Sequence, residues 1–142
     1  MTDIITVYTD GACKGNPGPG GWAYLILPDT IKRGGSAQTT NNQMELRAIL
    51  EAIQTVPANS NVELYTDSKL CIDWLARRWK RNIPAIDKMV REIMTLVEQR
   101  NISLSLHKVK GHDGDENNTI VDAAASQTAT EWQRRQRQST RP

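Results

Sequence analysis

Residues 4–11 have the sequence Ile-Ile-Thr-Val-Tyr-Thr-Asp-Gly, a run of β-branched and aromatic residues that stops at an Asp-Gly pair. Such residues favour strands and Asp-Gly favours a turn, so the run predicts a β-strand that ends at Asp10. The same ending recurs at residues 65–68, Tyr-Thr-Asp-Ser, after a short apolar run that begins at Val62. The sequence therefore predicts two β-strands that each end at an aspartate, and the rest of the fold is predicted from the segments around them.

The segments around these two strands predict the rest of a mixed sheet. Residues 15–21, rich in glycine and proline, are expected to form a loop. Three hairpin-linked strands followed by strand–helix alternation predict an α/β protein. Its five-stranded mixed sheet would have three antiparallel strands, then two parallel ones, with helices on both faces. Further strands are expected at 22–27, 31–39 and 102–106, and helices at 42–56, 68–81, 86–99 and 119–131.

The composition favours one folded domain with a short tail. A chain of 142 residues with 38% hydrophobic and 24% charged residues fits a single globular domain, which we place at residues 1–132. The two cysteines, Cys13 and Cys71, are far apart and are expected to be reduced. No apolar run approaches the ~20 residues of a membrane helix, and the N-terminus does not resemble a secretion signal. We therefore expect a cytoplasmic protein that does not bind membranes.

The charge of the chain is concentrated at its C-terminus. The net charge is +2, and four arginines lie within residues 133–142, so the rest of the chain is slightly negative. Global charge therefore does not indicate nucleic-acid binding, and only local clusters could. Residues 133–142, rich in Arg, Gln, Ser and Thr, are expected to form a basic, disordered tail.

Two aspartates and one glutamate are the first candidates for a functional site. Asp10 and Asp67 end two expected strands, and ligands of open α/β sheets bind outside the carboxyl ends of strands. The alternative is that each aspartate starts a turn or caps a helix. A helical wheel places Glu45 between Ala52 and Val56, where a carboxylate is costly unless it is paired or metal-bound. Its alternative is a glutamate that leans outward at the helix start.

Asp122 is the fourth candidate acid, and it is followed by three alanines. Such small side chains let a helix approach a sheet closely, although an acid near a helix start is also favoured by the helix dipole. Crowded carboxylates repel one another unless divalent cations neutralise them, and oxygen ligands select Mg²⁺ or Mn²⁺. Two such ions, ~3.5–4 Å apart, can hold an attacking water and a leaving oxygen on a phosphodiester. The acids therefore indicate phosphoryl-transfer hydrolysis.

Four segments in order resemble type 1 ribonuclease H. They are Tyr-Thr-Asp-Gly at 8–11, Thr-Thr-Asn-Asn-Gln-Met-Glu-Leu at 39–46, Thr-Asp-Ser at 66–68, and Gly-His at 111–112 with Asn118 and Asp122 following. Order and spacing agree to about Trp132. The resemblance implies the ribonuclease H-like fold and a metal-dependent endoribonuclease. It would hydrolyse the RNA strand of RNA·DNA hybrids by two-metal-ion catalysis, leaving 5′-phosphate and 3′-hydroxyl ends.

The resemblance also implies roles for the acids and for one histidine. Asp10, Glu45, Asp67 and Asp122 would hold two Mg²⁺ ions, with Mn²⁺ as an alternative, and Asp10 would bridge both. His112 would be the mobile loop histidine that assists product release or proton transfer. From the residues alone, His112 is equally compatible with an exposed bystander in a polar loop.

The resemblance implies a substrate-binding set as well. RNA is distinguished from DNA chiefly by the 2′-hydroxyl in the shallow minor groove, and short amides both donate and accept hydrogen bonds there. Asn16, Asn41 and Asn42 match minor-groove positions, the backbone of Cys13 lies close by, and Thr40 matches a residue that grips a DNA phosphate. The alternatives are a loop residue for Asn16, helix caps for Asn41 and Asn42, and a strand-end residue for Thr40.

The strongest basic cluster lies at residues 74–81, Trp-Leu-Ala-Arg-Arg-Trp-Lys-Arg. Trp79, Lys80 and Arg81 are the residues we expect to contact the substrate, because aromatic faces beside cations suit a nucleic-acid backbone. The alternative is an amphipathic helix with a solvated basic face and Trp74 in the core. The chain lacks the basic protrusion of longer bacterial relatives, and we expect Asn82 or the Arg-rich tail to compensate.

Three other functions compete with this interpretation. A non-catalytic ribonuclease H-like module would bind nucleic acid without cleaving it, because a fold can be retained when its catalytic activity is lost. An enzyme of the same architecture could act on another phosphodiester, and a scaffold protein would use the acids only as helix caps. The complete acid set and the inward position of Glu45 favour the ribonuclease. We expect a monomer with an RNA·DNA hybrid as its partner and no obligate protein partner.

Overall fold

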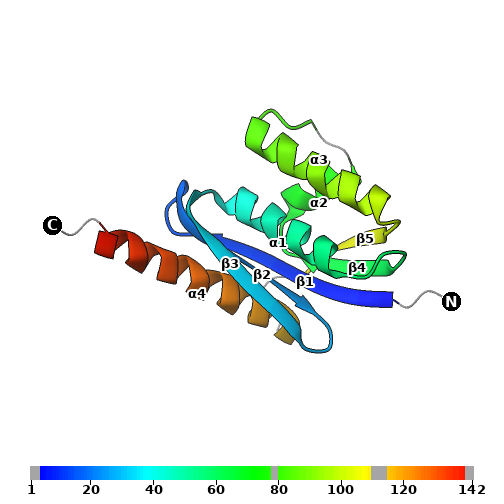
Figure 1. Ribbon diagram of the computed structural model, residues 1–142, viewed down its shortest axis with the longest axis horizontal. Helices are drawn as coiled ribbons and strands as arrows, with labels where there is room; N and C mark the ends of the chain where they lie inside the picture. The colour runs from blue at the N-terminus through cyan, green and yellow to red at the C-terminus, as the bar shows by residue number, and fades with distance from the viewer. Residues whose placement is uncertain (1–3, 78–79, 110–114, 140–142) are drawn as a thin grey trace.

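Five strands form one mixed sheet in the computed structural model, which describes residues 4–77, 80–109 and 115–139 (Figure 1). The order across the sheet is β3-β2-β1-β4-β5. Neighbours among β1, β2 and β3 are antiparallel, whereas β1 with β4 and β4 with β5 are parallel. The predicted fold class is therefore confirmed. The strands are β1 Ile4–Cys13, β2 Gly18–Ile26, β3 Thr30–Thr39, β4 Asn61–Thr66 and β5 Ser103–Lys108.

Helices cover both faces of the sheet, which Figure 1 shows with α4 on one side and α1, α2 and α3 on the other. On the three-helix side, a large apolar cluster joins strand residues such as Val7 and Leu64 to helix residues such as Ile49 and Ile93. On the other side, Leu25 and Val121 belong to a smaller cluster beneath α4. Within the described part of the chain, no helix is long and apolar enough to span a bilayer. The helices are α1 Asn41–Thr55, α2 Lys69–Ala76, α3 Pro84–Gln99 and α4 Glu116–Ser139.

Strand β2 begins earlier than the sequence predicted. The loop expected over residues 15–21 is wrong for 18–21, because Gly18 already pairs with Thr39 of β3, and Gly20 with Cys13 of β1. A Cβ on Gly21 would overlap the carbonyl oxygen of Ala125 and lie 2.8 Å from the backbone nitrogen of Ala129. Glycine at this position therefore serves the close approach of α4 to the sheet rather than a turn.

Gly21→Ala is expected to destabilise the protein markedly. The added methyl group would push against the α4 backbone, which gives way less easily than a side chain, and overpacking of this kind costs about 1–3 kcal/mol. Urea unfolding of both proteins measures the loss. Ala58→Ser, at an exposed position, serves as the control and should change stability by less than about 0.5 kcal/mol. Equal stability of Gly21→Ala and the parent protein would contradict the close packing of α4.

Helix α4 is longer than predicted at both ends. It begins at Glu116 because the carboxylate of Asp115 accepts hydrogen bonds from the backbone nitrogens of Asn117, at 3.0 Å, and Asn118, at 3.3 Å. It continues to Ser139, so the expectation of disorder from residue 133 is wrong for residues 133–139. The side-chain amide of Gln136 donates to the carbonyl oxygen of Ala37 at 2.6 Å, which holds this end of the helix on β3.

Helix α2 is shorter than the predicted segment 68–81. Ser68 caps it by accepting a hydrogen bond from the backbone nitrogen of Cys71, and the helix ends at Ala76. Beyond the helix, the guanidinium of Arg81 pairs with Asp87 of α3 at 2.9 Å. Pro84 then opens α3, where its fixed φ and missing N–H suit the first helical turn. Both cysteines are free, as predicted.

Candidate metal centre

Three carboxylates from three elements meet at one edge of the sheet. One oxygen from each of Asp10, Glu45 and Asp67 lies within 4.8 Å of the others. Asp10 lies in β1 and Asp67 directly follows β4, and the parallel register that pairs Tyr8 with Tyr65 brings the two aspartates side by side. Glu45 comes from the second turn of α1. The structure thus brings together three of the four acids that the sequence singled out.

A glycine in β1 allows α1 to deliver Glu45 to this cluster. A Cβ on Gly11 would overlap the backbone nitrogen of Glu45, so only glycine permits the helix to pass so close to the strand. Thr40 fixes the start of the helix, because its hydroxyl accepts a hydrogen bond from the backbone nitrogen of Gln43 at 3.2 Å. Glu45 consequently points inward and is only 4% exposed, as the helical wheel predicted.

The carboxylates of the cluster are difficult to ionise together. Burial, reinforced by the charge of Asp67, raises the pKa of Asp10 to about 7. Burial and the neighbouring Asp10 also raise the pKa of Glu45 well above its ordinary value. The pKa of Asp67 is raised by burial first and by the charge of Asp122 second. The site therefore concentrates carboxylates that oppose one another's ionisation, and among the described residues Lys108 lowers the pKa of Asp67 only in part.

The donor set of this cluster fits a divalent cation. The Oε2 atom of Glu45 is buried and has no hydrogen-bond partner within the described part of the chain. A buried carboxylate oxygen left in this state is costly unless a ligand compensates it. Carboxylate oxygens are the ligands of hard ions such as Mg²⁺ and Mn²⁺. Asp10, Glu45 and Asp67 are therefore the residues that would hold such an ion.

Asp122 lies at the rim of the cluster. It is exposed on α4 and is not part of the three-residue set, but its charge raises the pKa of Asp67. A hydrogen bond with Asp122 also contributes to the raised pKa of Asp10. The close approach of α4 that the small residues predicted is confirmed, since Ala125 packs against Gly21. Asp122 is thus within electrostatic reach of the two aspartates.

The predicted minor-groove residues gather at the corner between β1, β2 and the start of α1. The side-chain oxygen of Asn16 accepts a hydrogen bond from the backbone nitrogen of Asn41 at 3.0 Å, which ties the β1–β2 loop to the helix. Asn42 is half-buried in the first turn of α1. The thiol of Cys13 donates to the carbonyl oxygen of Gly15 at 2.8 Å. The cap at Thr40 uses only an acceptor lone pair, so its hydroxyl proton is left to donate to a ligand.

The basic cluster at residues 74–81 does not present one continuous face. Trp74 is 8% exposed and packs in the core, as the alternative interpretation had it. Lys80 and Asn82 are exposed, whereas the guanidinium of Arg81 is engaged by Asp87. Trp79 lies outside the described residues, as does His112. Of the three residues expected to contact substrate here, Lys80 is the one that the structure places in solvent.

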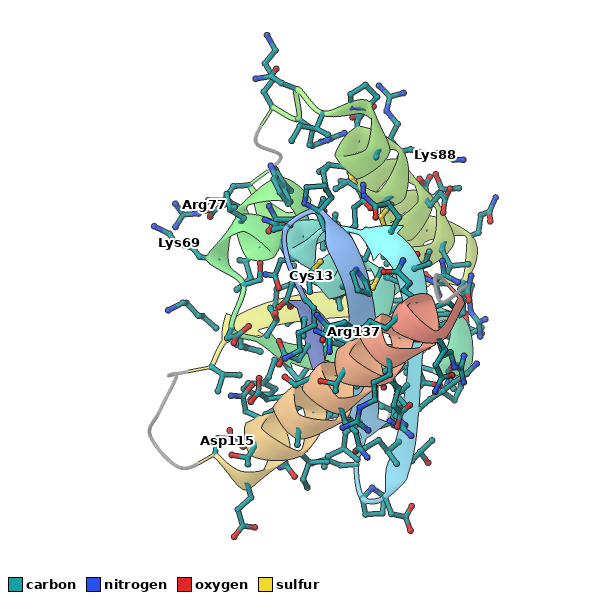
Figure 2. The ribbon with its side chains drawn as sticks, turned by 90° about the vertical axis from the view of Figure 1, so that its left-hand side faces the viewer. Cys13, Lys69, Arg77, Lys88, Asp115 and Arg137 are labelled. Atoms are coloured by element: carbon teal, nitrogen blue, oxygen red, sulfur yellow. The ribbon has the colours of Figure 1, made fainter. Side chains whose placement is uncertain are left out.

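Other residues around the centre were not predicted from the sequence. The hydroxyl of Tyr8 donates to Asp115 at 3.1 Å, so the start of α4 is tied to β1 two residues before Asp10. The only sequence signal for this contact was an acid directly before a helix. Figure 2 shows Lys69 and Arg77 of α2 pointing outward on the same side of the molecule as Asp115. Both are exposed, and they add positive charge to the side that carries the acids.

The five-stranded mixed sheet, with carboxylates that could hold a metal ion at its central strand, has the architecture expected of the ribonuclease H-like fold. A sequence model of RNase H matches residues 2–130. The chain belongs to the ribonuclease H family and is a ribonuclease H-type hydrolase, which confirms the resemblance seen in the sequence.

Relatives with similar sequences are ribonucleases H of bacteria. The ribonuclease H of Chlorobium phaeovibrioides is 39% identical over 141 residues, covering 88% of this chain and 94% of the relative. The ribonuclease H of Erythrobacter litoralis is 40% identical over 137 residues, covering 88% of this chain and 95% of the relative. Each alignment therefore extends over most of this chain and nearly all of the relative.

Solved structures of ribonucleases H share the fold. The N-terminal RNase H domain of a Mycobacterium tuberculosis protein superposes with a TM-score of 0.80 at 22% identity, covering 92% of this chain and 96% of that one. RNase H1 of the archaeon Halobacterium salinarum gives 0.74 at 26% identity, covering 91% and 99%. LC11-RNase H1, solved in complex with an RNA/DNA hybrid, gives 0.77 at 22% identity, covering 89% and 97%.

Proposed function

We propose that this chain is an endonuclease that hydrolyses the RNA strand of RNA·DNA hybrids and leaves 5′-phosphate and 3′-hydroxyl ends. The proposal rests on the cluster of buried Asp10, buried Glu45 and exposed Asp67 in a ribonuclease H family member. Among the described residues, the Oε2 atom of Glu45 has no hydrogen-bond partner. The hybrid bound to LC11-RNase H1, a protein of the same fold, supports the substrate.

The cofactor proposed for this centre is Mg²⁺, two ions per site with substrate bound, and Mn²⁺ is the alternative. Asp10, Glu45 and Asp67 would hold the ions, and Asp122 would complete the set from the rim. When bound, such ions supply positive charge at the scissile phosphate and lower the pKa of water. Asp10 would help to hold both ions, a role supported by its interactions with each of the other three acids.

Residues at the corner beside the centre are proposed to select the hybrid. Asn16, Asn41 and Asn42, with the backbone of Cys13, would read the 2′-hydroxyls of the RNA strand in the minor groove. The Thr40 hydroxyl, whose proton the helix cap leaves available, would donate to a phosphate of the DNA strand. The hydrogen bond between Asn16 and Asn41 holds two of these groups in fixed relation before substrate arrives.

Several weaker proposals complete the mechanism. Lys80 and Trp79 are proposed to contact the nucleic-acid backbone, whereas Arg81 would first have to leave Asp87. His112 is proposed to transfer a proton or to assist product release. The protein is proposed to act as a monomer, with the hybrid as its partner.

The proposed substrate specificity is tested with four labelled nucleic acids that share one sequence. Incubation with Mg²⁺ should cut the RNA of an RNA·DNA hybrid and leave single-stranded RNA, double-stranded RNA and double-stranded DNA intact, and EDTA should stop the reaction. The reason is that cleavage requires both the cation and 2′-hydroxyls in the groove of a hybrid. Tight binding of the hybrid without cleavage would refute the proposal and favour a non-catalytic module.

A further inference from the structure

The last two turns of α4 form a basic segment with no acid of its own. Arg134, Arg135 and Arg137 lie here, and the chain has no acidic residue after Glu131. The guanidinium of Arg33 pairs with Glu131 at 3.2 Å, so the nearest carboxylate is already neutralised. Arg134 and Arg135 are exposed. Positive charge therefore dominates this end of the helix.

The basic segment is held on the sheet by its neighbours. A Cβ on Gly35 of β3 would overlap the Trp132 indole, so the absence of a side chain there lets the ring pack against the strand. The Gln136 amide donates to the carbonyl oxygen of Ala37 at 2.6 Å. The guanidinium of Arg135 lies 5.3 Å from the centre of the Trp132 ring. The arginines are therefore presented by a docked helix rather than by a loose tail.

The segment ends beside the corner that carries the proposed minor-groove residues. Ala37 is two residues before Thr39, which pairs with Gly18 at the β1–β2 connection, and Asn41 opens α1 just beyond. Figure 1 shows the β1–β2 connection and the end of α4 at the same end of the molecule. Figure 2, which looks on to that end, shows Cys13 close above Arg137. The cations and the substrate corner thus share one side of the protein.

We propose that Arg134 and Arg135 form a second contact surface for the phosphodiester backbone of the hybrid. Asp122 and Arg134 are separated by about 18 Å along α4, from the helical rise of ~1.5 Å per residue. At an axial rise of ~3.4 Å per nucleotide of one strand, this distance corresponds to about five base pairs along a duplex that runs parallel to α4. The surface positions the duplex through charge and carries no sequence preference. This proposal rests on the proposed function.

Salt-dependent binding of a long hybrid tests the surface. The variant Arg134→Gln/Arg135→Gln is compared with the parent in an Asp10→Asn background with Mg²⁺, so that the hybrid stays intact. Each lost phosphate contact removes about 0.9 from the slope of log affinity against log salt, so the double variant should be shallower by about 1.8. Fluorescence anisotropy between about 50 and 200 mM salt gives the slope.

The matched control removes the same charge from the opposite side of the sheet. Lys88 and Arg91 are both exposed on α3, where Figure 2 shows Lys88 far from Arg137. Lys88→Gln/Arg91→Gln should keep the parental slope, and the exposed pair of Arg91 with Asp87 contributes little to stability. An unchanged slope in the α4 variant, or an equal loss in both variants, would overturn the proposal.

Cleavage of hybrids of different lengths shows how far the contact lies from the cleaved bond. It also tests the contact surface independently of the proposed nuclease activity. With Asp10 restored, the α4 variant should raise KM for a long hybrid at unchanged kcat. It should leave KM unchanged for a hybrid that ends fewer than about five base pairs from the cleaved bond on either side, because such a duplex is too short to reach the arginines. An equal rise in KM for both lengths would overturn the inference alone. Failure of the parent protein to cleave any hybrid would overturn the proposed function.

Discussion

Asp10→Asn is expected to lower the rate of hybrid cleavage by about 10³-fold or more. Asp10 is 3% exposed and interacts with the three other acids, so the amide would remove a negative oxygen from the middle of the cluster. Cations at such a site contribute several kcal/mol of charge stabilisation in the transition state. Since each ~1.4 kcal/mol is a factor of ten, losing about 4 kcal/mol corresponds to 10³-fold. Single-turnover cleavage of a labelled hybrid measures the loss.

The control for this variant is Asp29→Asn. Asp29 lies exposed between β2 and β3, outside the cluster of Asp10, Glu45 and Asp67, and its variant carries the same chemical change. Its variant should cleave at the parental rate. An Asp10→Asn protein that is folded and still cleaves within about tenfold of the parent, a barrier change of only ~1.4 kcal/mol, would exclude Asp10 from the catalytic machinery.

The metal-free protein is expected to lose stability as the pH rises, and Asp10→Asn is expected to remove much of that loss. The pKa of Asp10 is about 7 in the folded protein, chiefly through burial, against 3.8 for an ordinary aspartate. Between these values the folded state holds a proton that the unfolded state has lost, so the free energy of unfolding falls with pH. Glu45 and Asp67, whose pKa values are also raised, act in the same direction. At pH 8 the variant should be more stable by about 2–4 kcal/mol.

Urea unfolding in EDTA at about pH 5 and pH 8, below and above the folded-state pKa, measures this effect. The parent should be less stable at the higher pH, and the variant should show a smaller difference. Adding Mg²⁺ at pH 8 should stabilise the parent more than the variant, because a ligand that binds only the folded state adds stability that grows with the logarithm of its affinity. A parent protein whose stability in EDTA rises between the two pH values would contradict the buried, uncompensated cluster.

Local patterns in the sequence were sufficient to predict the sheet and most helices. Strands such as β4 alternate or run apolar between turn residues, and α1 has a clear apolar face, so periodicity identifies them. The start of β2 was missed because Gly18, Gly20 and Gly21 look like a loop by composition. Glycine at position 21 is required by α4, more than a hundred residues later in the chain, which packs against it. Local propensity contains no information on such a tertiary contact.

The acids of the centre were predictable for two different reasons. Asp10 and Asp67 share a Tyr-Thr-Asp motif, although the prediction that the first strand ends at Asp10 is wrong, because β1 continues in pairing with β2 as far as Cys13. Glu45 interrupts an apolar helix face, which is costly without a compensating ligand. The state of the basic residues was not predictable. The pairing of Arg81 with Asp87 depends on where α2 ends. The docking of residues 133–139 depends on the packing of Trp132 against Gly35 and on the hydrogen bond from Gln136 to Ala37 of β3. Side chains with many rotamers are placed by tertiary contacts rather than by their neighbours in sequence.

The central claim is that carboxylate-bound cations carry out hydrolysis of the RNA strand, and analysis of the RNA ends after cleavage tests it most directly. A hybrid with internally labelled RNA is cut in Mg²⁺ and, in parallel, incubated in EDTA. The account predicts fragments with 5′-phosphate and 3′-hydroxyl ends in Mg²⁺ and intact RNA in EDTA. Fragments ending in 2′,3′-cyclic phosphate would mean that the 2′-hydroxyl, not water, is the nucleophile, and cleavage that persists in EDTA would mean that no divalent cation is required. Either result would contradict the account.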